Sequence, residues 1–77
     1  MGETFSTTIE AGLRKREEIL IFIKEYVSER KYPPTIREIG SGVNLRSSSS
    51  VHRHLNKLEA EGKISIDRNI PRAIRVL

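Results

Sequence analysis

Apolar side chains recur at spacings of three and four residues between residues 13 and 30. This spacing places them on one face of a helix and predicts a first helix over about residues 13–30. Ile21 falls on the opposite, exposed side, and Pro33 and Pro34 end the helix because proline lacks an amide proton. The side chains expected in the core are Ile19, Phe22, Ile23, Tyr26 and Val27, with Leu20 beside them.

Residues 1–12 precede this pattern and are mostly small and polar. We interpret them as a flexible N-terminal arm or as a remnant that is not native. Thr7 and Glu10 have the spacing of a capping box, which would allow a helix to begin as early as Thr8. Gly12 favours the later start, because glycine is a poor helix former.

A shorter amphipathic segment follows the prolines and predicts a second helix over about residues 35–43. Thr35 and Glu38 have capping-box spacing, in which each side chain accepts from the other residue's backbone amide. Gly42 and Asn44 mark the end of the helix, because asparagine tolerates the left-handed conformation of a sharp turn. The predicted buried stripe consists of Ile36, Ile39 and Val43, with Leu45 filling the turn.

A third helix is predicted over about residues 47–61, with Ser47 as its N-cap and Gly62 as its C-terminal stop. Its buried face is expected to hold Val51, Leu55 and Leu58. The opposite face carries no carboxylate, since Glu59 lies at its flank. That polar face consists of Ser49, Arg53 and Asn56, flanked by Ser50, His52 and Lys57.

A short helix, a turn of about three residues and a second helix form a helix-turn-helix, whose second helix enters the DNA major groove. Hydroxyls, an amide, an imidazole and cations on that helix can reach phosphates and base edges. The alternative is an ordinary amphipathic surface helix, because helical pairs also occur in proteins that do not bind DNA. The turn chemistry and the basic face together favour DNA binding.

Residues 63–66 alternate polar and apolar side chains, residues 67–71 are rich in turn formers, and residues 73–77 predict a second strand. The resulting hairpin, or wing, carries Arg68 and Arg72 at its tip. These arginines can reach the phosphate backbone or an adjacent minor groove, or they can simply be solvated. The expected fold is mainly α with a small β-hairpin, a three-helix winged helix-turn-helix domain over residues 13–77.

The net charge of +4 comes from the C-terminal part of the chain. Residues 1–45 hold seven basic and seven acidic side chains, whereas residues 46–77 hold seven basic and three acidic ones. A local basic excess of this kind suits a polyanion. The chain has no cysteine, no signal peptide and no apolar run long enough to cross a bilayer, so we expect a cytoplasmic protein without a membrane partner.

The two histidines do not predict a metal site. His52 and His54 are two positions apart on a helix, so they point about 200° apart and cannot share an ion. We expect His52 to face the DNA groove. His54 is expected to pack against the first or the second helix, with a phosphate contact as the alternative. No nucleophile–base pair or carboxylate pair predicts catalysis. We therefore expect no catalytic residue, no cofactor, no metal and no small-molecule substrate.

Three segments carry a resemblance to a known family: K-Y-P-P-T-I-R-E-I-G, S-S-S-S-V-H-R-H-L-N-K-L-E-A-E-G and I-P-R-A-I-R-V-L. Over about residues 14–77, without gaps, the chain resembles the N-terminal DNA-binding domain of the LexA repressors of the bacterial SOS response. The V-H-x-H-L and P-R-A-I forms are similar to those of Gram-positive lineages. The resemblance implies a winged helix-turn-helix repressor that binds palindromic double-stranded operators as a homodimer.

The resemblance also implies which residues contact DNA. Other branches of the family carry two acidic residues where this chain has His52 and Arg53, so their operator sequence is not transferred. The base contacts fall by position on Ser47, Ser49, Ser50, His52 and Arg53. The expected phosphate contacts are Arg46, Asn56, Lys57, Arg68 and Arg72.

The resemblance further implies that full-length relatives carry a C-terminal domain that dimerises and cuts its own linker with a serine–lysine dyad. No such dyad or cleavage site is recognisable in residues 1–77, so we expect no enzymatic activity from this chain. The alternative function is a winged-helix module that binds proteins and has no sequence-specific DNA binding. This alternative rests on analogy of fold alone, and it predicts no salt-dependent affinity for duplex DNA.

Overall fold

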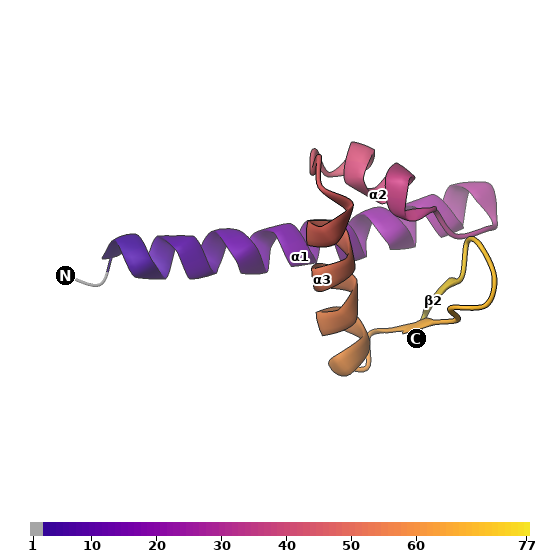
Figure 1. The fold of residues 1–77 in the computed structure, drawn as a ribbon. Helices are drawn as coiled ribbons and strands as arrows, with labels where there is room; N and C mark the ends of the chain where they lie inside the picture. Colours follow the sequence, from indigo (N-terminus) through magenta and orange to yellow (C-terminus); the bar gives the residue numbers. More distant parts are fainter. Residues whose placement is uncertain (1–2) are drawn as a thin grey trace.

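Three helices and a two-stranded hairpin make up the computed structural model, which describes the backbone of residues 3–77 and the side chains of residues 12–77. The second half of α1 packs against the other elements, and its first half projects away from them (Figure 1). This arrangement confirms the predicted winged helix-turn-helix fold. The elements are α1 (Glu3–Arg30), α2 (Ile36–Gly42), α3 (Ser48–Ala60), β1 (Ile64–Ile66) and β2 (Ile74–Val76).

The first helix begins at Glu3, well before the start predicted at about residue 13. The predicted helix start at about residue 13 is therefore wrong, because α1 extends through most of the stretch interpreted as an arm or remnant, and residues 1–2 lie outside the described part of the chain. Gly12, which favoured the later start, lies inside the helix. One glycine inside a helix costs about 1 kcal/mol relative to alanine, but it does not end the helix.

Local backbone chemistry defines both ends of α2. The capping box is confirmed, because the Thr35 amide donates to Glu38 Oε1 at 2.8 Å and the Glu38 amide donates to Thr35 Oγ1 at 3.1 Å. At the other end Asn44 is left-handed, with φ 60°, and the Leu45 amide donates to the Gly40 carbonyl at 2.7 Å. This hydrogen bond, which spans five positions of the chain, is the wider-spaced of the two that define a Schellman motif.

Gly42 has a role that the sequence did not reveal. It was interpreted as a marker of the helix end, but it also lies against the ring of Phe22 in α1. A Cβ at Gly42 would overlap atoms of that ring. The Lys15 ammonium group of α1 donates to the Val43 carbonyl at 2.8 Å, next to the same contact. Together these contacts fix the C-terminal end of α2 on α1.

The helix α3 lies across α1 (Figure 1). Ser47 occupies the predicted N-cap position, with φ −92° and ψ 122°, but its hydroxyl makes no capping hydrogen bond. The predicted stop is confirmed, because Gly62 has φ +76° and its amide donates to the Glu59 carbonyl. The Lys63 amide donates to the Leu58 carbonyl at 3.0 Å, which completes a Schellman motif.

The wing is an antiparallel pair of three-residue strands, as predicted. Ile64 lies opposite Val76, and Ile66 lies opposite Ile74. The loop between the strands is closed at its base by a hydrogen bond from the Asp67 amide to the Ala73 carbonyl at 3.0 Å. Ile64 and Ile74 are buried, so one face of the hairpin packs on the helices.

One hydrophobic core joins all five elements. The predicted buried face of α3 is confirmed, and Ile21 of α1 is 49% exposed, also as predicted. Phe22 and Val27 are half-buried and pack against the core, whereas Tyr26 is half-buried and contacts the ring of Phe22. The buried apolar residues are Ile19, Ile23, Ile39, Val43, Val51, Leu55, Leu58, Ile64 and Ile74. Because α3 buries one face in this cluster, its opposite face is held toward solvent.

Candidate nucleic-acid interface

The polar face of α3 is exposed, as the sequence predicted. Ser50 is half-buried, and the other predicted residues of this face are open to solvent. None of Arg37, Arg46, Arg53 and Lys57 forms an ion pair with a carboxylate of residues 12–77. The exposed predicted contacts on α3 and the preceding turn are Arg46, Ser47, Ser49, His52, Arg53, Asn56 and Lys57.

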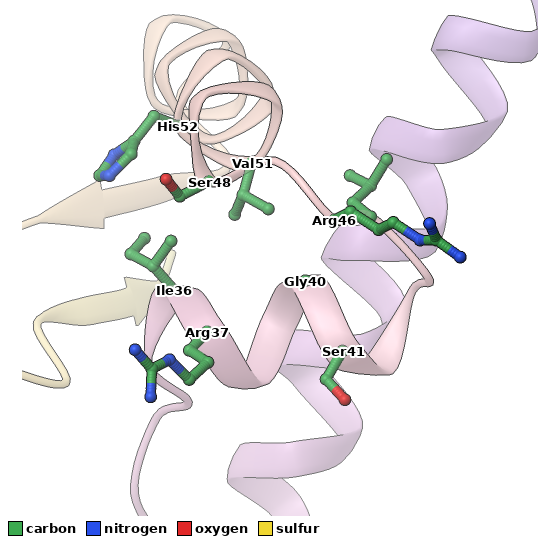
Figure 2. Close-up of a pocket in the computed structure, with 9 residues that line it drawn as sticks. Ile36, Arg37, Gly40, Ser41, Arg46, Ser48, Val51 and His52 are labelled. Carbon is green, nitrogen blue, oxygen red and sulfur yellow. The ribbon is translucent and has the colours of Figure 1, made fainter.

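A groove separates α2 from the first turns of α3. Figure 2 shows Ile36 and Val51 between the two helices, with Ser48 and His52 on the α3 side. Arg37 and Arg46 stand at opposite ends of this groove (Figure 2). The helix-turn-helix thus frames an open groove with a basic side chain at each end.

Arg37 is the cationic residue of this surface that the sequence interpretation missed. It is exposed on α2, inside the segment that was interpreted only as a capping box. The available signal was a basic residue in the first helix of a helix-turn-helix, a helix that crosses the DNA backbone in this motif. That position alone could have identified Arg37 as a candidate phosphate contact.

A second groove lies on the other side of α3, between that helix and the wing. His52 and Asn56 of α3 line it, together with Arg68 and Ile70 from the loop between β1 and β2. His52 lines both grooves, so it stands on the ridge between them. The ridge carries the face that the sequence assigned to base contacts.

Arg68 forms hydrogen bonds with two side chains of α3. Its Nη2 donates to Glu59 Oε1 at 3.1 Å and to Asn56 Oδ1 at 3.2 Å. Glu59 Oε2 also accepts from the Ile66 amide at 3.1 Å. The hydrogen bonds from Arg68 and then from Ile66 lower the pKa of Glu59. The Arg68 side chain is nevertheless 63% exposed, so it stays accessible to a phosphate.

Arg72 is placed differently from the wing-tip position that the sequence suggested. Its guanidinium donates to Glu38 Oε1 at 2.8 Å and to Glu38 Oε2 at 3.1 Å, in a two-pronged ion pair. The hydrogen bonds from Arg72 and from the Thr35 amide lower the pKa of Glu38 to about 2, from 4.5. The structure therefore directs the Arg72 guanidinium toward the start of α2, although its side chain remains 37% exposed.

His54 lies at the edge of the core, in agreement with the packing role that the sequence favoured. Its Nδ1 atom is buried and has no hydrogen-bond partner. Burial lowers the pKa of His54 from its ordinary value of 6.5, and the nearby positive charges of Arg16, Arg53 and Lys15 lower the pKa further. Both effects favour the neutral form of His54 relative to an ordinary histidine.

This lowered pKa predicts a pH dependence of stability. The folded state binds a proton at His54 less readily than the unfolded chain does, so stability is full above about pH 6.5 and falls as the pH drops through the folded-state pKa. We expect the melting temperature of the wild type to fall between about pH 7 and pH 5, and His54→Gln to flatten that fall. His52→Gln, at an exposed position on the same helix, should follow the wild type. Equal slopes for wild type and His54→Gln would contradict this assignment.

Within the described side chains, no group of three or more His, Cys, Asp or Glu residues lies together as potential metal ligands. The same part of the chain contains no helix with the length and apolarity needed to span a membrane.

Comparison with known proteins identifies the family. The family model described as the LexA DNA binding domain matches residues 11–73. The LexA repressor of Halalkalibacterium halodurans is 55% identical over 64 residues, which are 83% of this chain and 31% of that protein. The LexA repressor of Bacillus mycoides is 52% identical over 69 residues, which are 90% of this chain and 34% of that protein.

The chain thus spans about a third of the length of the curated relatives it matches. The stretch matched by the family model contains α2, α3 and β1, including the exposed polar face of α3, and it ends just before β2. It is a DNA-binding domain and not a catalytic one. This chain belongs to the LexA DNA-binding domain family.

Proposed function

We propose that this domain is the sequence-specific DNA-binding part of a transcriptional repressor that occupies operators of the SOS type. The observation that carries the proposal is the exposed face of α3, on which every side chain from Arg46 to Lys57 is neutral or cationic. A carboxylate on this face would repel phosphates, and none is present there. The relatives that are called LexA repressors support the regulatory role.

The roles proposed for individual residues follow from position and chemistry. The ridge of α3 reads base edges in the major groove, where a guanidinium suits guanine and an imidazole or hydroxyl suits several bases. The flanking cations contact phosphates and set the register of the helix. The proposed base contacts are Ser47, Ser49, Ser50, His52 and Arg53, and the proposed phosphate contacts are Arg37, Arg46, Asn56 and Lys57.

The two wing arginines receive separate roles. Arg68 is exposed and makes its ion pair with Glu59 through one nitrogen, so it can exchange that carboxylate for a DNA phosphate. Arg72 holds several partners within the domain and is not proposed as a phosphate contact.

The assembly and the larger protein are also proposals. Palindromic operators imply two copies of the domain, one per half-site, with the symmetry of the dimer matching that of the DNA. We propose that the domain acts in the bacterial cytoplasm at the nucleoid, linked to a C-terminal dimerising, self-cleaving domain like that implied by the family resemblance. One isolated domain should bind a half-site weakly, because the avidity of a dimer is absent.

Fluorescence anisotropy with two duplexes tests this function. A labelled palindromic operator of the Gram-positive type is compared with a scrambled duplex at about 50 and 200 mM salt. We expect preference for the operator, and an affinity that falls on the order of 100-fold over this range if about four phosphates are contacted. Equal, salt-sensitive binding to both duplexes would reduce the function to non-specific DNA binding. No binding to either at low salt would favour the protein-interaction module.

A further inference from the structure

A single carboxylate joins the start of α2 to the wing. Glu38 Oε1 accepts from the Thr35 amide at 2.8 Å, which caps α2, and also from Arg72 Nη1 at 2.8 Å. The two elements meet nowhere else through a side-chain ion pair within the described residues. The capping box of the helix-turn-helix is therefore also the docking point of the wing.

Three further groups hold the Arg72 guanidinium in place. Nη1 donates to the Pro33 carbonyl at 3.0 Å and to the Tyr26 hydroxyl at 3.3 Å. The guanidinium carbon lies 4.7 Å from the centre of the Tyr32 ring, in a cation–π contact. These partners belong to the C-terminal end of α1 and to the segment that leads into α2. A planar guanidinium can satisfy all of them at once, whereas an ammonium group cannot.

The backbone at Arg72 also indicates a position imposed from outside the loop. Its φ of +53° lies in the left-handed region, which side-chain-bearing residues rarely adopt. Such a conformation persists where surrounding contacts determine it. The contacts available to do so are those of the guanidinium with Glu38, Tyr32 and Pro33.

We propose that Arg72 is a positioning residue: through Glu38 it locks the wing onto the helix-turn-helix, and so fixes where the loop that carries Arg68 and Ile70 meets the DNA. This inference rests on the proposed DNA-binding function. The loop from Asp67 to Ala73 lines one wall of the groove beside α3, and Arg72 holds the end of that loop. Without this lock, the loop would have to be ordered when DNA binds, which weakens binding.

The competing assignment for Arg72 is a phosphate contact. The two assignments predict opposite effects of Glu38→Gln on DNA affinity. Glu38→Gln retains an oxygen that can cap α2, but it removes the charge that holds Arg72. If electrostatics alone mattered, the loss of a negative charge near DNA would strengthen binding. If Arg72 acts by positioning, Glu38→Gln weakens binding instead. Arg72→Lys separates the assignments in a second way. Lysine still binds phosphates as a point charge, but it cannot form the two-pronged pair that a guanidinium makes with a carboxylate.

The test is a double-mutant cycle with Arg72→Lys, Glu38→Gln and the double variant, measured by operator anisotropy at several salt concentrations. We expect each single variant to weaken operator binding roughly threefold to tenfold, and the double variant to be no weaker than the weaker single. The slope of log K against log salt should stay that of the wild type. Arg75→Lys is the matched control: it makes the same chemical change at an exposed position of β2 to which no DNA contact is assigned, so it should bind within about twofold of the wild type.

Three outcomes would each overturn the proposal. They are wild-type operator affinity for Arg72→Lys, additive losses of affinity in the double variant, and tighter operator binding by Glu38→Gln. Amide hydrogen exchange of Asp67, whose N–H closes the loop, provides a readout without DNA. Exchange should be faster in Arg72→Lys and Glu38→Gln than in the wild type, and unchanged exchange would overturn the lock. If the wild type shows no operator preference, the proposed function fails, and the exchange data alone then decide on the lock. If Glu38→Gln fails to fold because of its capping role, Arg72→Lys decides.

Discussion

Ile23→Ala is expected to lower the free energy of unfolding by about 2–5 kcal/mol, the cost of removing a large apolar side chain from a packed core. Ile23 is fully buried between α1 and the rest of the core cluster. In a domain of this size, each 1 kcal/mol lowers the melting temperature by roughly 4–8 °C. Thermal unfolding followed by circular dichroism, with chemical denaturation for the free energy, measures the effect.

Ile21→Ala is the matched control for this prediction. It makes the same chemical change on the same helix, two positions away, where the side chain is 49% exposed. Alanine is the better helix former, so we expect a change within about 0.5 kcal/mol of zero. Similar losses for Ile21→Ala and Ile23→Ala would mean that the described core is not the one that stabilises the domain.

The functional consequence of a weakened core is a misplaced recognition helix. Small domains have a total stability of only about 5–15 kcal/mol, so the loss expected for Ile23→Ala is a large fraction of it. The polar face of α3 is held outward only because Val51, Leu55 and Leu58 are buried on the other side. DNA binding by Ile23→Ala should therefore be lost near its reduced melting temperature, without any change at the interface.

The parts of the fold that the sequence predicted are those that depend on neighbouring residues. The capping box of Thr35 and Glu38 and the stop at Gly62 involve atoms within four or five positions of each other. The helical period likewise separated Ile21 from the core. The start of α1 was misjudged, because Gly12 weakens a helix without ending it.

The parts that the sequence did not predict depend on residues distant along the chain. Arg68 and Arg72 look alike as basic residues near a turn, yet Arg72 pairs with a carboxylate 34 positions away and with a hydroxyl 46 positions away. Nothing in a local pattern distinguishes the two arginines. Arg37 is a different case, because its position on the first helix of the helix-turn-helix could have identified it from the sequence.

Arg53→Ala is expected to weaken operator binding by about 1–3 kcal/mol, or roughly 5–150-fold, and to reduce discrimination between the operator and a scrambled duplex. Arg53 is exposed at the centre of the α3 face and has no ion pair with a carboxylate of residues 12–77. Its guanidinium is therefore free to bind the edge of a guanine through two hydrogen bonds. Anisotropy titrations of both duplexes at matched salt measure affinity and specificity together.

Two kinds of control variant distinguish the recognition of bases from the attraction between charges. Arg53→Lys keeps the positive charge but loses the two parallel hydrogen bonds of the guanidinium. It should therefore lose nearly as much specificity as Arg53→Ala while it retains more non-specific affinity. Lys57→Ala and Arg37→Ala remove proposed phosphate contacts, so each should weaken both duplexes alike and reduce the salt slope by about 1. If Arg53→Ala instead behaved like Lys57→Ala, with operator preference intact, Arg53 would be a phosphate contact. The contacts to base edges would then be assigned to His52 and the serines of the same ridge.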